Sequence, residues 1–311
     1  MHNYILRPTN FNEFKGKQNI VDNLLVFIQA AIKNKKQLDH ILLFGLPGTG
    51  KTSMAYVIAN YLSKKLKIIQ GTQIKKIQDL INFLSLCCDG DIVFIDEIHA
   101  LNIESMETLY SVLEDSCIDV KIGKDNNYKF VRIDIPKITI IGATTNINKI
   151  PKPLEERFGI SFYFDLYNEQ EMEDIIKSTA NKLGLEISEN DIILITSHSK
   201  GTPRIANKIL RRILDYKNIY PNLEIKEVLS LIGVYEYGLD KLDIAYLRSF
   251  STNTYLSLKT IAAISEINIQ TIENRIEPYL IKSNLITKSH QGRSLTYEGE
   301  MMLKNLNKKI N

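Results

Sequence analysis

One segment restricts the possible folds of this chain more than any other: Gly45-Leu46-Pro47-Gly48-Thr49-Gly50-Lys51-Thr52. It satisfies the pattern G-x-x-x-x-G-K-[ST]. It also lies between a continuously apolar run, residues 40–44, and an amphipathic helical pattern, residues 53–65. In such a strand–loop–helix unit, glycines let backbone N–H groups turn towards an anion at the start of the helix. The segment therefore predicts an α/β domain with a phosphate-binding loop.

The rest of the chain divides into three parts by pattern. Apolar runs at 92–95 and 138–142, with a helical pattern at 105–113 between them, predict further strands of a parallel sheet. Residues 168–238 are helical in pattern throughout, and Pro203 after Thr202 is typical of a helix start. We expect a P-loop domain over 1–167, an all-α lid over 168–238 and a third domain over 239–311.

The third domain has the pattern of a winged helix. Three helical patterns, 241–250, 257–265 and 269–280, precede a strand–turn–strand. The strands are expected at 285–289 and 294–297, with the turn at Gln291-Gly292 and a frayed, lysine-rich end after them.

Polar residues follow the apolar runs where a phosphate site would lie. Lys51 is expected to reach the β- and γ-phosphate oxygens, and the Thr52 hydroxyl to bind Mg²⁺. Asp96 and Glu97 end the second strand, where Asp96 can hold the magnesium shell and Glu97 can polarise an attacking water. Thr145 and Asn146 follow the third strand and are candidates to contact the γ-phosphate or that water, with a capping role as the alternative. The sequence thus predicts ATP hydrolysis; His99 is expected to be structural.

The composition of the chain indicates which compartment and which kind of partner to expect. No apolar run approaches the ~18 residues of a membrane span, and residues 1–10 lack a signal pattern, so we expect a cytoplasmic protein without membrane contact. Three cysteines without metal-ligand spacing, Cys87, Cys88 and Cys117, are interpreted as core thiols. Residues 240–311 hold ten Lys or Arg and seven Asp or Glu, whereas residues 1–239 hold 29 of each. This excess weakly favours an acidic partner such as nucleic acid.

An insertion separates the second and third strands. Ile118, Val120 and Ile122 alternate with polar residues, residues 123–127 have turn composition, and apolar residues alternate again at Val131 and Ile133. This pattern predicts a β-hairpin over 117–136. It can serve as a docking element, or it can pack on its own domain.

Together and in this order, the motifs resemble the AAA+ ATPase superfamily, and the resemblance narrows to the RuvB family of Holliday-junction branch-migration motors. The residues that carry it are spread over essentially the whole chain: Leu6-Arg7-Pro8, Phe11, Glu13-Phe14, Leu38-Asp39-His40, Asp96-Glu97-Ile98-His99, Ile141-Gly142-Ala143-Thr144-Thr145, Arg157-Phe158-Gly159-Ile160, Gly201-Thr202-Pro203-Arg204-Ile205-Ala206-Asn207 and Glu277-Pro278-Tyr279-Leu280-Ile281. A generic AAA+ protein would match at the nucleotide site alone.

The resemblance implies ATP and Mg²⁺ as cofactors and roles for named residues. Leu6 and Arg7 would line the adenine pocket, and Arg157 would be an arginine finger acting on ATP in a neighbouring subunit. Arg204 would be the sensor arginine of the lid. The remaining ATP contacts implied are Tyr167, the Glu114-Asp115-Ser116 backbone, Gly45, Gly48, Thr49, Gly50, Lys51, Thr52 and Ser53. A cationic clamp on a transferring phosphoryl group suits arginine, although a surface salt bridge is the alternative for both Arg157 and Arg204.

The resemblance also implies partners: a homo-oligomer, expected to be a hexameric ring on duplex DNA, and a RuvA-like junction-binding protein docked on hairpin 117–136. DNA contacts are expected from Arg275, Lys288 and Arg293. Glu155 and Ala100 stand where the family usually has arginine, and the wing is less rich in arginine than the family pattern. Two other functions fit part of the sequence, a clamp-loader or initiator-loader ATPase and an ATP-gated winged-helix regulator.

Overall fold

A computed structural model describes residues 6–124, 127–250 and 255–310, and it divides by internal packing into two compact units. The first unit runs through Ser188 and includes Gly201–Leu210; the second comprises Glu189–Lys200 and the residues from Arg211 onward. Residues expected for the lid therefore contribute to both units. The limits 1–167, 168–238 and 239–311 stay a prediction.

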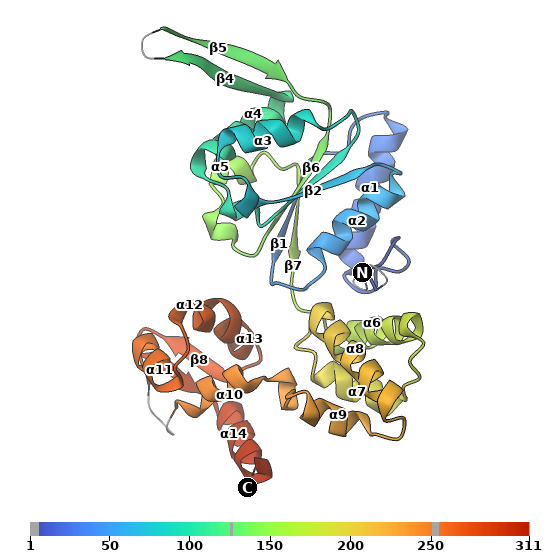
Figure 1. The fold of residues 1–311 in the computed structure, drawn as a ribbon, viewed down its shortest axis with the longest axis vertical. Coiled ribbons are helices and arrows are strands. Elements are labelled where there is room, and N and C mark those ends of the chain that lie inside the picture. Colours follow the sequence, from blue (N-terminus) through green and yellow to red (C-terminus); the bar gives the residue numbers. More distant parts are fainter. Residues whose placement is uncertain (1–5, 125–126, 251–254, 311) are drawn as a thin grey trace. The chain divides into compact units, whose positions relative to one another are not determined.

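The first unit is built on a parallel sheet of five strands in the order β2-β3-β6-β1-β7 (Figure 1). Their bounds are Ile41–Gly45 (β1), Leu66–Gln70 (β2), Ile92–Asp96 (β3), Thr139–Thr144 (β6) and Ile160–Phe164 (β7). Strands β1, β3 and β6 confirm the three apolar runs of the sequence. The edge strands β2 and β7 are additional.

Side chains alternate between the two faces of this sheet, and each face has its own core. Leu42, Val93 and Ile140 face one side, whereas Leu43, Phe94 and Ile141 face the other. Helices α3 (Ile77–Ser85), α4 (Ile103–Asp115) and α5 (Lys152–Glu155) cover the first face, and α1 (Gln18–Lys33) and α2 (Lys51–Tyr61) cover the second (Figure 1). Burial on both faces explains why the central strands are continuously apolar.

The predicted hairpin is present between α4 and β6. Strands β4 (Cys117–Lys124) and β5 (Asn127–Asp134) pair antiparallel, with Ile118 opposite Ile133 and Val120 opposite Val131. It projects from the sheet domain beyond the end of α4 (Figure 1). Ile118 is fully buried and Val120 packs against the core, whereas Val131 is 41% exposed. The root of the hairpin is thus part of the domain, and its apolar face becomes exposed further out.

Four helices follow the sheet, as the helical pattern predicted. They are α6 (Glu169–Leu183), α7 (Glu189–Ser197), α8 (Pro203–Ile219) and α9 (Ile225–Leu231). Asn168 caps α6 by accepting a bond from Glu171 N at 2.8 Å. Helix α8 begins at Pro203, where the missing N–H of proline costs no helical bond.

The second unit contains the expected winged helix. Its helices are α10 (Lys241–Arg248), α11 (Leu258–Ser265) and a longer one built from α12 (Ile269–Thr271), a π-helical turn at Ile272–Ile276 and α13 (Glu277–Lys282). The wing is β8 (Ile286–Ser289) and β9 (Gly292–Leu295), and Leu256 adds a bridge to Arg293. Gly292 pairs with Ser289, so the turn lies one residue earlier than expected, at His290 and Gln291.

The expectation of a frayed end is wrong. Residues Tyr297–Ile310 form helix α14, which begins at a residue expected to end the second strand. Met302 and Leu306 of α14 are 3% exposed and belong to the winged-helix core. Burial of this apolar stripe holds the helix in place despite its lysines. None of the described helices is long and apolar enough to cross a membrane.

Candidate nucleotide-binding site

The loop between β1 and α2 has the backbone of a phosphate cradle. Gly45 and Gly50 have φ values of 135° and 104°, which side chains with a Cβ rarely adopt. A Cβ on Gly45 would lie 2.2 Å from Phe164 O, so glycine is required there. Thr49 Oγ1 donates to Leu46 O at 2.8 Å and holds the loop closed. The loop ends at the first turn of α2, where free N–H groups favour an anion.

Lys51 is the first residue of α2, and its ammonium group is buried inside this loop. Its side chain donates to Gly45 O and to Leu46 O, both at 2.8 Å, and the residue is 7% exposed. Burial lowers the pKa of Lys51 to about 8, partly offset by the nearby carboxylates of Glu97 and Asp96. Two carbonyl oxygens stabilise an ammonium less than a full negative charge does. The loop and Lys51 together therefore fit a polyphosphate.

Asp96 ends β3 and Glu97 follows it, at the same edge of the sheet. Glu97 has a left-handed backbone, with φ 51°. Its Oε2 accepts a bond from Thr145 Oγ1 at 3.0 Å and lies 3.1 Å from His99 Nδ1. His99 Nδ1 is also 2.8 Å from Thr144 Oγ1, and burial lowers the pKa of His99. The structure thus brings Glu97 and Thr145 together, as the sequence suggested, and adds His99 as a support of the carboxylate.

The donors available for a magnesium ion are few. Asp96 accepts from Glu97 N at 3.1 Å and from Gln70 Nε2 at 3.4 Å, and Thr52 stands in the first turn of α2. No group of three or more His, Cys, Asp or Glu that could hold a metal occurs in the described part of the chain. Mg²⁺ usually keeps several waters and takes one or two protein ligands beside phosphate oxygens. The Thr52 hydroxyl and the Asp96 carboxylate therefore fit a Mg²⁺ ion that also binds phosphate and water, and they do not suit a metal held by protein ligands alone.

Tyr167, between β7 and α6, and Arg204 of the lid also reach the phosphate loop. Tyr167 donates its hydroxyl to Thr49 O at 2.9 Å, and burial raises its pKa. Arg204 is the second residue of α8; its N–H donates to Gly48 O at 3.4 Å. A Cβ placed on Gly48 would lie 3.0 Å from the Cβ of Arg204, so the two segments are in close contact. Tyr167 and Arg204, both expected to lie near the nucleotide, therefore lie at the loop.

The N-terminal segment contacts the helix that follows the loop. Leu6 is 6% exposed, and the Arg7 guanidinium lies 4.9 Å from the ring centre of Tyr56 on α2. Ser53 completes the first turn of α2, and Asn146, after β6, donates its N–H to Thr144 Oγ1 at 2.9 Å. Ser53 and Asn146 thus lie at the carboxyl edge of the sheet, and Arg7 lies against α2.

Arg157 lies away from this edge. Strands β1 and β7 are parallel with Ile41 opposite Ile160, so Arg157 precedes β7 at the amino edge, whereas the phosphate loop follows β1 at the carboxyl edge. Five strand residues separate the two edges by roughly 15 Å.

At that amino edge Arg157 is paired with the end of α4. Its Nε lies 3.0 Å from Glu114 Oε1, its Nη2 donates to Glu114 Oε2 at 3.3 Å, and its Nη1 donates to Pro153 O at 2.7 Å. Asp115 and Ser116 follow directly, and Ser116 O accepts from Ile135 N at 2.7 Å. Arg157 and the segment 114–116 thus form a second group, separate from the phosphate loop of their own chain.

The cations expected to contact DNA are partly engaged within the winged helix. Glu277 is 1% exposed; it accepts from Arg293 Nε at 2.8 Å, from Lys288 Nζ at 3.3 Å and from the Tyr246 hydroxyl at 3.2 Å. Burial raises the pKa of Glu277, but the two cations outweigh this and the net pKa is lowered.

Arg293 is the most engaged of these cations, and its expected contact with DNA stays a prediction. Its side chain is 12% exposed and its guanidinium points to Glu277, because the buried carboxylate needs a paired cation. The Lys288 side chain is 45% exposed, and Arg275 is paired with Asp240 at 2.5 Å.

Three family models cover nearly the whole chain. The Holliday junction DNA helicase RuvB P-loop domain matches residues 6–164, the RuvB AAA lid domain matches 167–240, and the RuvB C-terminal winged helix domain matches 236–304.

Individual proteins match over the same length. The RuvB subunit of the Holliday junction branch migration complex of Ureaplasma parvum serovar 3 is 46% identical over 305 residues, covering 97% of each chain. That of Mycoplasma genitalium is 42% identical, covering 96% of this chain and 97% of the relative. Among solved structures, the Thermotoga maritima RuvB Holliday junction branch migration motor matches with a TM-score of 0.85 and 31% identity, covering 96% of this chain and 98% of that chain.

The fold and the site define an ATPase of the AAA+ class, in which a P-loop sheet domain is followed by a helical lid and a winged helix. Within that class the chain belongs to the RuvB family, since models of that family match all three of its parts.

Proposed function

We propose that this chain is an ATP-driven motor that moves the branch point of Holliday junctions in recombination and repair. The observation that carries the proposal is the match of RuvB models to the P-loop, lid and winged-helix parts together with an intact phosphate loop. Clamp loaders and winged-helix regulators share the phosphate loop but not the whole-chain match. The chain hydrolyses ATP, and we assign the reaction to the cytoplasm, where junction DNA and ATP occur together.

Nucleotide is held from three sides in this proposal. Lys51 takes the β- and γ-phosphate oxygens, and the N–H groups of the loop and of Ser53 take the remainder. Thr52 and Asp96 hold Mg²⁺ with water completing its shell. Leu6, Arg7 and Tyr167 bound the nucleoside end. The short contacts of Lys51 with the loop carbonyls support this arrangement, because the same ammonium can move to an anion entering the loop.

Glu97 orients and polarises the attacking water. Its support by Thr145 and His99 fits this role, since a general base needs a fixed direction. Arg204 contributes positive charge beside the phosphates from the lid.

Arg157 serves the nucleotide of a neighbouring chain. Its position at the amino edge of the sheet, roughly 15 Å from the phosphate loop, supports a role in trans rather than in cis. Its pairing with Glu114 keeps the guanidinium ready at that surface. An arginine supplied in this way requires an oligomer with head-to-tail contacts, and we propose a hexameric ring around duplex DNA.

The hairpin β4–β5 docks a RuvA-like junction-binding protein, and the winged helix grips DNA through Lys288 and Arg275. Val131, 41% exposed on the apolar face of the hairpin, supports a docking surface. For DNA we expect phosphate contacts, because a motor must move over any sequence.

A synthetic four-way junction with one labelled arm tests the function directly. With ATP, Mg²⁺ and a RuvA-like partner, the chain should convert the junction into two duplexes, seen as labelled products on a native gel. A Glu97→Gln chain should bind the junction and release none. ATP hydrolysis by the wild type without any arm exchange, with the partner bound, would favour a different DNA-linked ATPase.

A further inference from the structure

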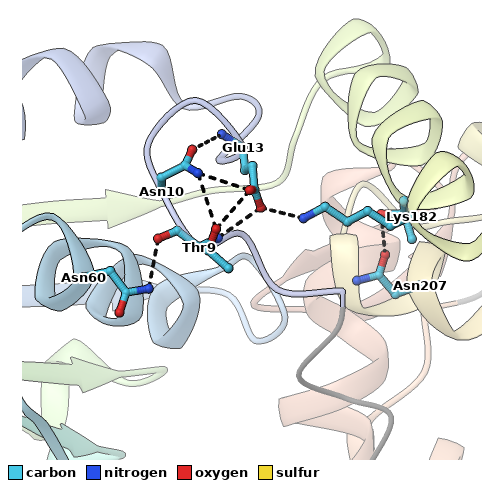
Figure 2. Close-up of polar contacts among 7 residues, drawn as sticks. Thr9, Asn10, Glu13, Asn60, Lys182 and Asn207 are labelled. Atoms are coloured by element: carbon cyan, nitrogen blue, oxygen red, sulfur yellow. Dashed lines mark hydrogen bonds and ion pairs between the residues drawn. The ribbon is translucent and has the colours of Figure 1, made fainter.

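A cluster of polar side chains joins the N-terminal segment to two helices (Figure 2). Glu13 accepts bonds from Thr9 N at 3.1 Å and Thr9 Oγ1 at 2.9 Å, and from Asn10 Nδ2 at 3.1 Å. Thr9 O accepts from Asn60 Nδ2, near the end of α2, at 2.9 Å. Lys182, in the last turn of α6, forms an ion pair with Glu13 Oε2 at 2.7 Å. The Lys182 contact, followed by the bonds from Thr9, lowers the pKa of Glu13 to about 2, so this carboxylate is charged at neutral pH.

The same N-terminal segment holds the other end of α6. Lys17 N donates to Glu171 Oε1 at 2.6 Å, and Lys17 Nζ donates to Leu166 O at 2.9 Å. Helix α6 has 15 residues and is about 22 Å long. Its start is fixed by the bonds of Lys17 to the Glu171 side chain and to Leu166 O, beside the buried Tyr167, whereas its end is fixed by an ion pair between side chains about one-third exposed. The end of α6 is therefore where it can be released most easily.

Helix α6 is connected to the nucleotide site through α8. One turn before Lys182, the Thr179 hydroxyl donates to Asn207 Oδ1 at 3.2 Å. One turn before Asn207 is Arg204, whose backbone contacts Gly48 of the phosphate loop. A short path of contacts thus leads from the Glu13–Lys182 pair to the residue that faces the phosphates.

We propose that Glu13 and Lys182 form a latch that positions α6 and α8, and thereby Arg204, and so slows the release of nucleotide. Neither residue touches the nucleotide in this proposal; both are positioning residues. The proposal rests on the proposed ATPase function, because it assigns regulation to the same site. With the latch open, the end of α6 is free to move, and the first turn of α8 loses its support beside the loop.

Release of a fluorescent ADP analogue, displaced by excess ATP in a stopped-flow experiment, tests this on the full chain. Lys182→Met removes the charge and leaves the Thr9–Asn10–Glu13 bonds intact, and it should speed release about two- to fivefold, the range for an exposed ion pair. Lys182→Arg should restore the wild-type rate. Lys33→Met, at an exposed lysine in the last turn of α1 of the same unit, is the matched control and should change nothing.

Two further measurements separate a latch from a general loss of stability. Higher salt should speed release from the wild type, because screening weakens the Glu13–Lys182 ion pair. It should have less effect on Lys182→Met, which has no such pair. Glu13→Gln combined with Lys182→Met should release no faster than the faster single variant, since both remove one interaction.

Additive effects, or equal salt dependence in wild type and Lys182→Met, would overturn the latch. A wild-type chain that binds no ADP analogue at all would refute the ATPase function itself, and that outcome is distinct because no release signal would then exist.

Discussion

At the scale of single residues, the active site depends on how Glu97 is held. Its left-handed backbone and its bonds to Thr145 and His99 aim one carboxylate oxygen rather than leaving it free to rotate. A non-glycine residue in this conformation costs about 1–3 kcal/mol, a cost often found at functional sites. Under the proposed role of Glu97, the backbone that follows β3 contributes to catalysis by fixing the direction of this side chain.

Glu97→Gln should bind ATP normally and hydrolyse it on the order of 10²-fold more slowly, because the amide cannot accept a proton from water. Steady-state phosphate release and nucleotide affinity, measured on the same sample, check both parts. Lys51→Ala is the contrasting variant, since it should lose binding as well. Normal turnover by Glu97→Gln would exclude Glu97 as the base.

His40 makes the stability of the P-loop domain depend on pH. Its Nδ1 accepts a bond from Ile140 N at 2.9 Å, and burial lowers the pKa of His40 to about 4. In the unfolded chain the pKa is about 6.5, so between these values the unfolded state binds more protons. Neutral His40 therefore stabilises the folded domain fully above about pH 6.5. This stabilisation declines as the pH falls towards 4 and amounts to on the order of 3 kcal/mol.

Urea unfolding at pH 7.5, 6 and 5 should therefore show falling stability in the wild type and a flatter pH profile in His40→Gln. His290→Gln, at an exposed residue of the wing turn, is the control and should keep the wild-type slope. Identical slopes in wild type and His40→Gln would mean that another group controls the acid response.

At the scale of elements, the wing needs Arg293 for its fold. Arg293→Ala would leave the buried carboxylate of Glu277 with the Lys288 ammonium and the Tyr246 hydroxyl as its partners, and breaking a buried pair costs about 3–5 kcal/mol. We expect the winged helix of Arg293→Ala to melt at a lower temperature than that of the wild type, as measured by circular dichroism.

Lys288→Ala should instead leave the fold intact and reduce the slope of log K against log salt for duplex DNA by about one unit. An unchanged slope would show that Lys288 makes no phosphate contact.

The hairpin offers a sharper test than its sequence pattern suggested. Val120 packs against the core, whereas Val131 opposite it is 41% exposed. Val131→Asp should therefore keep basal ATPase and end stimulation by a RuvA-like partner, measured as ATP turnover with and without that partner. Val120→Asp is expected to lower stability as well, because it buries a charge. Loss of basal activity in Val131→Asp would indicate that the hairpin packs on its own domain.

Much of this architecture could be predicted because local signals and tertiary structure agree. The strands β1, β3 and β6 are apolar on both faces and end in the polar residues of the site. The edge strands β2 and β7 could not be identified, since the polar residues Lys67 and Ser161 interrupt their apolar pattern. Helix α14 was missed because its lysines outweigh the narrow stripe of Met302 and Leu306.

Contacts between distant residues could not be predicted from any local pattern. Lys182 and Glu13 are separated by 169 positions, and Arg293 and Glu277 by 16. Nothing in the spacing of these residues indicates that they pair, because the fold alone brings them together. For the same reason the pairing of Arg293 with Glu277 could not be expected from the sequence of the wing.

At the scale of the whole molecule, the separation of Arg157 from its own phosphate loop predicts complementation. Arg157→Ala chains alone should bind ATP and hydrolyse little. Mixing them with Lys51→Ala chains should restore part of the activity, because one mutant supplies the finger and the other the intact loop. ATPase rates over a range of mixing ratios check this. Mixed rings without recovery would count against a finger in trans.

Because Arg157 and the phosphate loop lie at opposite edges of the sheet, the number of complete nucleotide sites depends on how many contacts the chains make with one another. Under the proposed role of Arg157, each contact between two chains completes one site, so an open row of chains always leaves its last nucleotide unserved. Closing the row supplies the missing contact without adding a chain. Turnover per chain should therefore rise with assembly and level off once the circle is closed. Single chains would bind ATP and hydrolyse it very slowly, so ATP would be consumed only after a ring has formed.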